Sequence, residues 1–431
     1  MSQCATGAPV GGELVGPRTG AIVLGLTLLA YAALALGYAT RTAAWQNPDE
    51  PAHYNYVAFV AHSGTLPELE VGDWDSALLE RLKNGRLQPG DSIDSIRYES
   101  WQPPLFYLLA APVFRLDPTH DQLLHLRLFN VFLGGLALLL AFHVARPLLG
   151  DALAAAVPLT MAGIPMFTAV SAALSADPLA NLLAAAILLL LVHGVRAGVS
   201  SKRAATTGLL LGLGMLTKLA LAIFVPIALL VVLFRSCRPR REAAIVLGVA
   251  GLLLLPWLVH QVTTYGWTDP LATARHAQVV SDQPRFPGFS PAYIGLALTI
   301  TFHSFWAQFG WMAIPAPDRL YWIWGGLCVL ASLGLGLRSR RGPVTPSWIL
   351  MLGTLLAAAS GYVVYNLTFE QLQGRYLFTA LVPIAVLLVA GWAALVPPRS
   401  QRLLGIGIGL LLLSLNAYTL TQVLVPGFSS P

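Results

Sequence analysis

The chain has 431 residues, of which 56% are hydrophobic and only 11% carry a charge. Soluble domains have about 25% charged residues, so this composition excludes a soluble globular protein. The formal net charge is +6, but the basic residues cluster in short loops without interleaved aromatic residues, which argues against nucleic acid as a partner.

Long apolar runs predict a polytopic, all-α membrane protein. Several of them exceed the roughly 18 apolar residues that cross a bilayer. The first span is expected at about residues 20–40, and Arg18 before it places the N-terminus on the cytoplasmic side. The preceding segment has a single basic residue and the apolar run is long for a signal peptide, so we expect a retained signal anchor.

Further spans are expected along the rest of the chain, and basic residues set their direction. They cover about residues 125–145, 152–174, 178–196, 243–260, 320–337, 346–365 and 375–396, with a last span that ends near residue 425. The stretch between Arg203 and Arg235 has basic residues at both ends, so we expect a hairpin of two short helices with Lys218 at its outer turn. The count is about eleven spans, with the C-terminus outside, in one transmembrane domain over residues 1–431.

Two long segments are expected outside the membrane. The first extracytoplasmic loop covers residues 41–122 and the second covers residues 261–317. All but three of the 20 acidic residues are expected on this side, which marks it as the polar and working face. In the first loop, the stretch WQPPLFYLLAAPVF is too short to cross and predicts an interfacial helix. Residues 291–317 are likewise expected to stay on the outer face or dip into it.

The sequence NPDEPAHYNY, residues 47–56, follows the first span directly and contains two acidic residues, a histidine and two tyrosines. Pro51 suits the first position of a helix that runs to about residue 61. Asp49 and Glu50 then lie at its N-terminus, where acidic residues also simply complement the helix dipole. The functional interpretation is a general base held at the membrane surface, with His53 beside it to donate to a phosphate or a hydroxyl. A divalent metal is compatible with these residues but is not required by them, so the cofactor is left open.

Two basic residues at outer helix ends are candidate phosphate partners. Lys218 either extends to the interface or pairs with a lipid-linked phosphate. Arg375, in the sequence QGRY, has five donors in a fork that suits phosphate, although an interfacial anchor is an equal alternative. The stretch SFWAQFGW, which contains Trp306, is either an aromatic interfacial segment or the lining of a groove for an acyl or prenyl chain.

Signals for cytosolic nucleotide chemistry and for a serine hydrolase are missing from the sequence. There is no Walker A or Rossmann glycine pattern and no GxSxG motif. Cys4, Cys237 and Cys328 lie far apart and indicate neither a disulfide framework nor a zinc site. A sugar donor used outside the cell must then arrive on another carrier, and a lipid carrier is the economical choice.

Five stretches taken together resemble the GT-C superfamily of membrane glycosyltransferases, in a branch related to protein O-mannosyltransferases and to the aminoarabinose transferase of lipid A. They occur in family order and span nearly the whole chain: NPDEPAHYNYVAFVAHSGTLPEL, WQPPLFYLLAAPVF, LLLGLGMLTKLALAIFVP, SFWAQFGW and QGRYLF.

The resemblance implies an inverting transfer from a polyprenyl-phosphate sugar to a cell-envelope glycan, lipid or protein on the extracytoplasmic face of the inner membrane. It assigns the base to Asp49, with Glu50 beside it, and phosphate contacts to Lys218 and Arg375. Gln102 stands where relatives often have a histidine before two prolines. The residues expected to bind substrate are His53, Tyr54, Gln102, Lys218, Trp306, Arg375 and Tyr376.

Other functions remain open at this point. A transporter or flippase of lipid-linked glycans also needs many spans, although it would be expected to carry charges at the membrane midplane. A polysaccharide polymerase or ligase would use a different donor, and a noncatalytic assembly subunit would tolerate replacement of Asp49.

Overall fold

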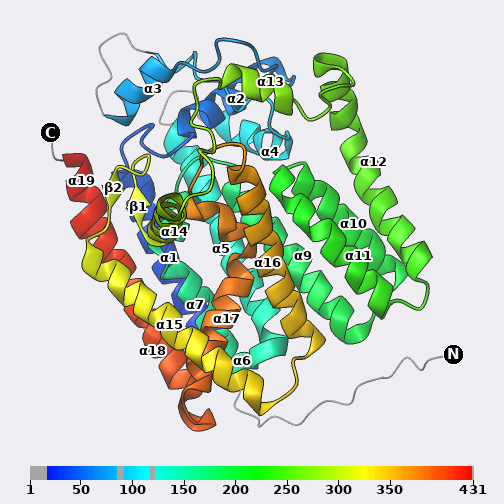
Figure 1. Cartoon of the computed structure of the whole chain (residues 1–431), viewed down its shortest axis with the longest axis vertical. Helices are drawn as coiled ribbons and strands as arrows, with labels where there is room; N and C mark the ends of the chain where they lie inside the picture. The colour runs from blue at the N-terminus through cyan, green and yellow to red at the C-terminus, as the bar shows by residue number, and fades with distance from the viewer. Residues whose placement is uncertain (1–16, 85–91, 117–121, 430–431) are drawn as a thin grey trace.

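The structure is a computed structural model, and it describes residues 17–84, 92–116 and 122–429. The side chain of Arg18 and the residues Asp91 and Cys4 lie outside the part of the chain that the structure describes. Within the described residues the protein is an all-α, polytopic bundle, as predicted (Figure 1). Helices dominate because a bilayer offers no water to backbone groups, which must be paired within each spanning segment.

Eight helices in the described part of the chain are long and apolar enough to span a membrane, or nine with one bent pair. The expected count of eleven is therefore not confirmed. The spanning helices, with their continuations, are α1 (Pro17–Arg41), α5 (Gln122–Leu149), α9 (Asp177–Ala197), α12 (Pro239–Tyr265), α15 (Asp318–Arg341), α16 (Pro346–Asn366), η2 with α17 (Gly374–Ala380 and Leu381–Ala394), and α18 with η3 and α19 (Pro398–Thr419, Leu420–Leu424 and Val425–Ser429).

The span expected as one continuous helix over residues 152–174 is broken. It consists of α6 (Asp151–Ala154), α7 (Ala156–Ala162) and α8 (Pro165–Ser171), with a bend of 71° before α8. Pro165 forces the preceding Ile164 into an extended conformation, which ends α7. All residues from 153 to 180 are buried, so the bend lies within the protein interior.

The hairpin expected around Lys218 is present. Its arms are α10 (Ser201–Met215) and, after the short η1 (Leu219–Ile223), α11 (Phe224–Arg235). The ends of the hairpin meet, because the amide of Val199 donates to the carbonyl of Arg235 at 3.0 Å. The two basic segments that flank the hairpin therefore lie side by side.

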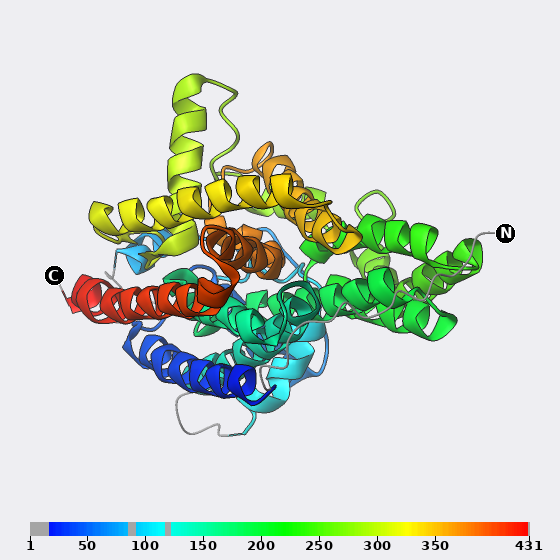
Figure 2. The ribbon, with the colours of Figure 1, turned by 90° about the horizontal axis from the view of Figure 1, so that it is seen from below.

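The segments predicted as outer loops together make up what we call the loop face. They form α2 (Glu50–Ser63), α3 (Ser76–Lys83), α4 (Leu105–Phe114), α13 (Thr273–Val279), α14 (Pro291–Trp306) and the antiparallel strands β1 (Gln308–Phe309) and β2 (Ile314–Pro315). Helices α2, α3, α4 and α13 gather at one end of the bundle, and α14, β1 and β2 lie below them (Figure 1). Helix α14 is seen end-on in Figure 1 and projects from the side of the bundle in Figure 2.

Helices α15 and α17 pack at unusually close range. A Cβ atom added at Gly334 would lie 1.8 Å from the carbonyl oxygen of Gly391. Small residues allow such close approach of helix backbones in membranes, where van der Waals packing drives association.

We therefore expect Gly334→Ala to lower the melting temperature of the purified protein, because overpacking costs about 1–3 kcal/mol. Gly336→Ala is the matched control on the same helix, since an added Cβ there meets no atom within 4 Å. Equal melting temperatures for the two variants would contradict the close α15–α17 contact.

Candidate functional site

Asp49 is held in an unusual backbone conformation at the start of α2. Its φ of 66° and ψ of −2° place it in the left-handed region, which costs free energy for a residue other than glycine. One carboxylate oxygen accepts a hydrogen bond from the Tyr98 hydroxyl at 2.8 Å, and the other accepts from Arg375 Nη2. With this backbone conformation the carboxylate points toward the start of α9, at Asp177, and toward η2, the short helix that precedes α17.

Glu50 lies next to Asp49 but has a different environment. Its side chain is fully buried and forms a bidentate pair with Arg127, with hydrogen bonds of 2.8 and 2.6 Å. Both carboxylate oxygens also accept bonds from the amides of Trp45 and Leu174, at 3.1 and 3.2 Å, and from the Asn47 side chain at 3.1 Å. Glu50, which was expected beside the base, therefore anchors the loop and does not line the cavities described below.

Two cations, Lys218 and Arg375, lie close to two carboxylates, Asp49 and Asp177. Lys218 Nζ bonds Asp177 at the start of α9, and the Arg375 guanidinium lies between Asp49 and Asp177, 3.8 Å from the second. Both cations also lie over the ring of Tyr376, with 5.5 Å between each charged group and the ring centroid. Opposite charges are thus brought together near Asp49 by three segments that are distant in sequence: the turn of the hairpin, the start of α9 and η2.

A cavity of about 390 Å³, which we call the deep cavity, opens at this cluster. Its polar wall includes Asp49, His53, Asp177, Lys218 and Arg375. The opposite wall is mainly apolar and comes from η1 and α16, with Leu219, Ala220, Ile223, Ala358, Gly361 and Val364 among its residues. The deep cavity therefore joins a charged end to an apolar slot between helices.

A second cavity of about 160 Å³ also borders Asp49, and we call it the loop cavity. It is lined by aromatic and polar residues of the loop face, such as Trp74, Trp311 and Gln283. Five residues line both cavities: Asp49, Glu99, His276, Tyr365 and Tyr376. The carboxylates of Asp49 and Glu99 therefore stand at the junction.

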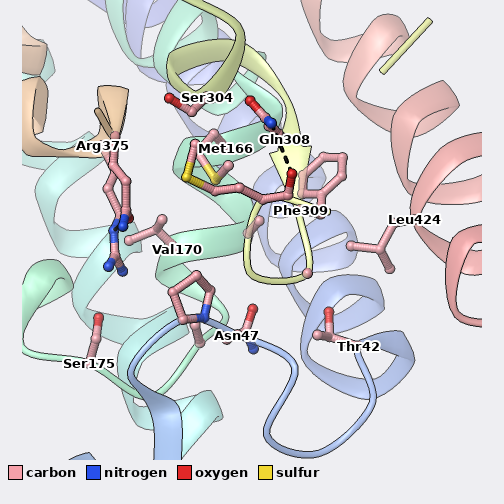
Figure 3. Close-up of a pocket in the computed structure, with 16 residues that line it drawn as sticks. Thr42, Asn47, Met166, Val170, Ser175, Ser304, Gln308, Phe309, Arg375 and Leu424 are labelled. Carbon is pink, nitrogen blue, oxygen red and sulfur yellow. Dashed lines mark hydrogen bonds between the residues drawn. The ribbon is translucent and has the colours of Figure 1, made fainter. Parts of the chain in front are cut away.

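Arg375 also borders a third, much smaller cavity of about 30 Å³, shown in Figure 3. Its guanidinium points to the side of this space where Ser175 lies, and Gln308 across the space donates to the Met312 carbonyl at 2.9 Å. The volume suits one or two water molecules, each of which needs roughly 10–15 Å³. It is too small for a substrate.

Burial and charge set the protonation of the groups around Asp49. Burial alone raises the pKa of Asp49, but the charge of Arg375 and the hydrogen bonds from Arg375 and Tyr98 outweigh it and hold the pKa below its usual value. Burial lowers the pKa of His53 to about 4, so His53 is neutral at pH 7 and bonds the Tyr107 hydroxyl at 2.8 Å. Burial, together with the charge of Asp49, raises the pKa of Glu99 to about 8.

The remaining residues expected to bind substrate fall into two groups. Gln102 lines the deep cavity, and Tyr376 lines both cavities. Tyr54 points away and donates to Gln122 at 2.8 Å, and Trp306 is buried in the core, stacked on Trp324 at 5.4 Å.

Polar residues that line the deep cavity but were not singled out from the sequence include Glu99, Asp177, Asn181 and His276. Asp177 begins a spanning helix, and an acidic residue at that position was the available signal. No group of three or more His, Cys, Asp and Glu side chains that could hold a metal ion occurs among the described residues.

The raised pKa of Glu99 predicts a specific pH dependence of stability. The folded protein holds a proton that the unfolded chain releases near the ordinary value of 4.5, so the contribution is complete below that pH and is lost as the pH rises through about 8. We expect the melting temperature of the wild type, relative to Glu99→Gln, to fall between about pH 4.5 and pH 8 and to level off above that range. The exposed Glu68 provides the control variant Glu68→Gln, for which the difference should stay flat. A flat difference for Glu99→Gln would contradict a protonated Glu99.

Comparisons with known proteins place this geometry in context. The family model described as "Predicted membrane protein (DUF2142)" matches residues 92–388, more than half of the chain. No curated protein sequence matches the chain.

Solved structures of low sequence identity have a similar fold. ArnT from Cupriavidus metallidurans, solved bound to undecaprenyl phosphate and in the apo state, matches with a TM-score of 0.56 and 16% identity, over 91% of this chain and 64% or 63% of that chain. The oligosaccharyltransferase of Archaeoglobus fulgidus, tethered to an acceptor peptide, matches with a TM-score of 0.50 and 12% identity, over 96% of this chain and 55% of that chain. The chain thus spans less than two thirds of the length of these structures. The GT-C-like fold expected from the sequence is confirmed.

Proposed function

The chain belongs to the DUF2142 family of membrane proteins, and from its site geometry we propose that it is a GT-C-type glycosyltransferase. It transfers a sugar from a polyprenyl-phosphate carrier to an acceptor hydroxyl at the loop face, which faces outward from the inner membrane, with the N-terminus in the cytoplasm. The observation that carries the proposal is the strained Asp49 carboxylate beside Lys218 and Arg375 at the polar end of the deep cavity.

The deep cavity suits a lipid-linked phosphate in both of its parts. The guanidinium fork of Arg375 and the ammonium of Lys218 provide charge-assisted donors for phosphate oxygens. The apolar residues of η1 and α16 provide a surface for the first isoprene units. The ArnT structure bound to undecaprenyl phosphate supports a carrier of this class.

The reaction follows from the placement of the charges. An acceptor hydroxyl oxygen attacks the anomeric carbon as the bond from that carbon to the phosphate oxygen breaks, and the electron pair of the broken bond stays on the phosphate. Asp49 accepts the hydroxyl proton, while Lys218 and Arg375 stabilise the charge that develops on the leaving phosphate. A single displacement of this kind inverts the anomeric configuration.

The ion pairs around Asp49 bear on the timing of this step. Arg375 bonds the base directly, and this bond contributes to the lowered pKa of Asp49. A donor phosphate that accepts hydrogen bonds from Arg375 weakens the bond from Arg375 to Asp49. Donor binding therefore makes Asp49 a stronger base. Lys218 exchanges Asp177 for phosphate in the same way.

We expect Asp49→Asn to reduce sugar transfer by at least about a hundredfold, the lower end of what a positioned general base contributes. The measurement is release of undecaprenyl phosphate from a panel of synthetic undecaprenyl-phosphate sugars by the protein in nanodiscs, with glycan, lipid and peptide acceptors. Asp94→Asn, on the exposed surface of the same loop, is the control and should retain full activity. An active, folded Asp49→Asn variant would remove Asp49 as the base.

We expect Arg375→Ala and Lys218→Ala to weaken binding of undecaprenyl phosphate at least tenfold each, about 1.4 kcal/mol. Arg375→Lys keeps the charge but loses the fork and should be intermediate. Arg319→Ala removes an arginine that bonds Tyr418 and lines neither cavity, and it should bind normally. Unchanged affinity in both alanine variants would refute the phosphate role, and tight binding without any transfer by the wild type would favour a flippase.

A further inference from the structure

We infer that the loop cavity is an acceptor subsite for a carbohydrate ring, which packs against Trp74 and Trp311 and presents its hydroxyl to Asp49. This inference rests on the proposed function and adds the chemical class of the acceptor. It commits to a glycan among the glycan, lipid and protein acceptors that the sequence left open.

The walls of the loop cavity combine flat aromatic faces with amide and carboxyl groups. Trp74 and Trp311 come from the first and second loops, and Gln283, Gln371 and Gln373 add side-chain amides. A sugar ring has apolar C–H faces that pack on indole and hydroxyl groups at its edge that pair with amides and carboxyls. A lining that joins aromatic faces to several amide and carboxyl side chains suits such a ligand.

Several polar atoms of these walls have no partner within the protein. They are the indole nitrogen of Trp74, one oxygen of Gln283 and one oxygen of Glu99, all buried as atoms. Buried polar groups are ordinarily paired, because leaving one unpaired costs about 1–3 kcal/mol. The three side chains line the loop cavity, so a small change of rotamer would offer a donor and two acceptors to the hydroxyl groups of a sugar.

The loop that carries Trp311 is strained. Gly310, Trp311 and Met312 all have positive φ, at 55°, 53° and 69°, between strands β1 and β2. The Trp311 indole nitrogen donates to the Trp45 carbonyl at 2.9 Å, which fixes the ring. Non-glycine residues in this region persist where the surrounding structure enforces them, and they cluster at ligand sites.

The loop cavity differs from the deep cavity in ways that disfavour a lipid acceptor. The deep cavity has the aliphatic wall of η1 and α16, whereas the lining of the loop cavity comes mainly from polar and aromatic residues of the loop face. Its volume of about 160 Å³ is roughly ten times the 10–15 Å³ that one water molecule needs. The loop cavity is therefore large enough to admit a small molecule and not only water.

The test measures sugar binding without the donor, by saturation-transfer-difference NMR on the full chain in nanodiscs. The probes are the methyl glycosides of glucose, galactose, mannose, N-acetylglucosamine and arabinose, beside a short peptide with Ser and Thr. We expect at least one glycoside to bind, and we expect Trp311→Ala and Trp74→Ala each to weaken its affinity at least fivefold.

Matched variants separate recognition from folding. Trp311→Phe keeps an aromatic face and should retain binding within about twofold, whereas Trp267→Ala removes an 86% exposed tryptophan outside the cavity and should change nothing. Melting temperatures identify any variant that fails to fold, and the alanine variant of the other cavity tryptophan then decides.

The inference is overturned if no glycoside of the panel binds, if binding is unchanged in folded Trp311→Ala and Trp74→Ala, or if only the peptide binds. Binding of undecaprenyl phosphate in the same nanodiscs reports separately on the proposed function. Carrier binding without glycoside binding rejects the carbohydrate subsite alone, and glycoside binding without carrier binding rejects the lipid-phosphate donor alone.

Discussion

The buried pair between Glu50 and Arg127 is the interaction on which the site depends. Arg127 on α5 bonds both oxygens of Glu50 and also donates to the carbonyls of Ala39, Thr42 and Ala43. It therefore ties the end of α1 and the start of α2 to α5 in a single network. Removing one partner of a buried pair leaves an uncompensated charge, which costs about 3–5 kcal/mol. The neighbouring Asp49 can hold a left-handed conformation because this network fixes the residues on either side of it.

A second network, around Arg375, is also balanced in charge, but its charged groups line the deep cavity. Arg375 and Lys218 face Asp49 and Asp177, so two positive and two negative groups share one enclosed space. Such a cluster is costly to desolvate unless each charge is paired. The pairs also bring the positive groups to the polar end of the deep cavity, where an anionic ligand can replace a carboxylate as partner. In the proposed function, pairing therefore holds these two cations in position for the donor phosphate.

The sequence was sufficient for features that depend on local chemistry. Hydropathy and basic residues predicted the spanning helices and the hairpin at Lys218, and the outer ends of helices pointed to Asp49 and Arg375. It was insufficient where a role depends on a distant partner. Glu50 resembles Asp49 in sequence, but Arg127, 77 residues away, takes up its carboxylate. Asp177 was placed at the start of a span, where the structure also has it, yet its neighbours Lys218 and Arg375 come from other helices. Trp306 lies in an aromatic stretch whose buried and exposed sides are set by its packing on Trp324.

Most residues with a strained backbone lie at or next to the loop cavity. Five non-glycine residues of the described chain have positive φ, and four of them, Trp45, Asp49, Trp311 and Met312, surround the loop cavity or support a residue that lines it. The deep cavity and the loop cavity share Asp49 and Glu99 as lining residues, so a ligand in either cavity lies next to the same carboxylates. A base at such a junction can contact an acceptor hydroxyl while the cations beside it hold a phosphate. The strain at Asp49 is then the structural cost of placing one carboxylate within reach of both.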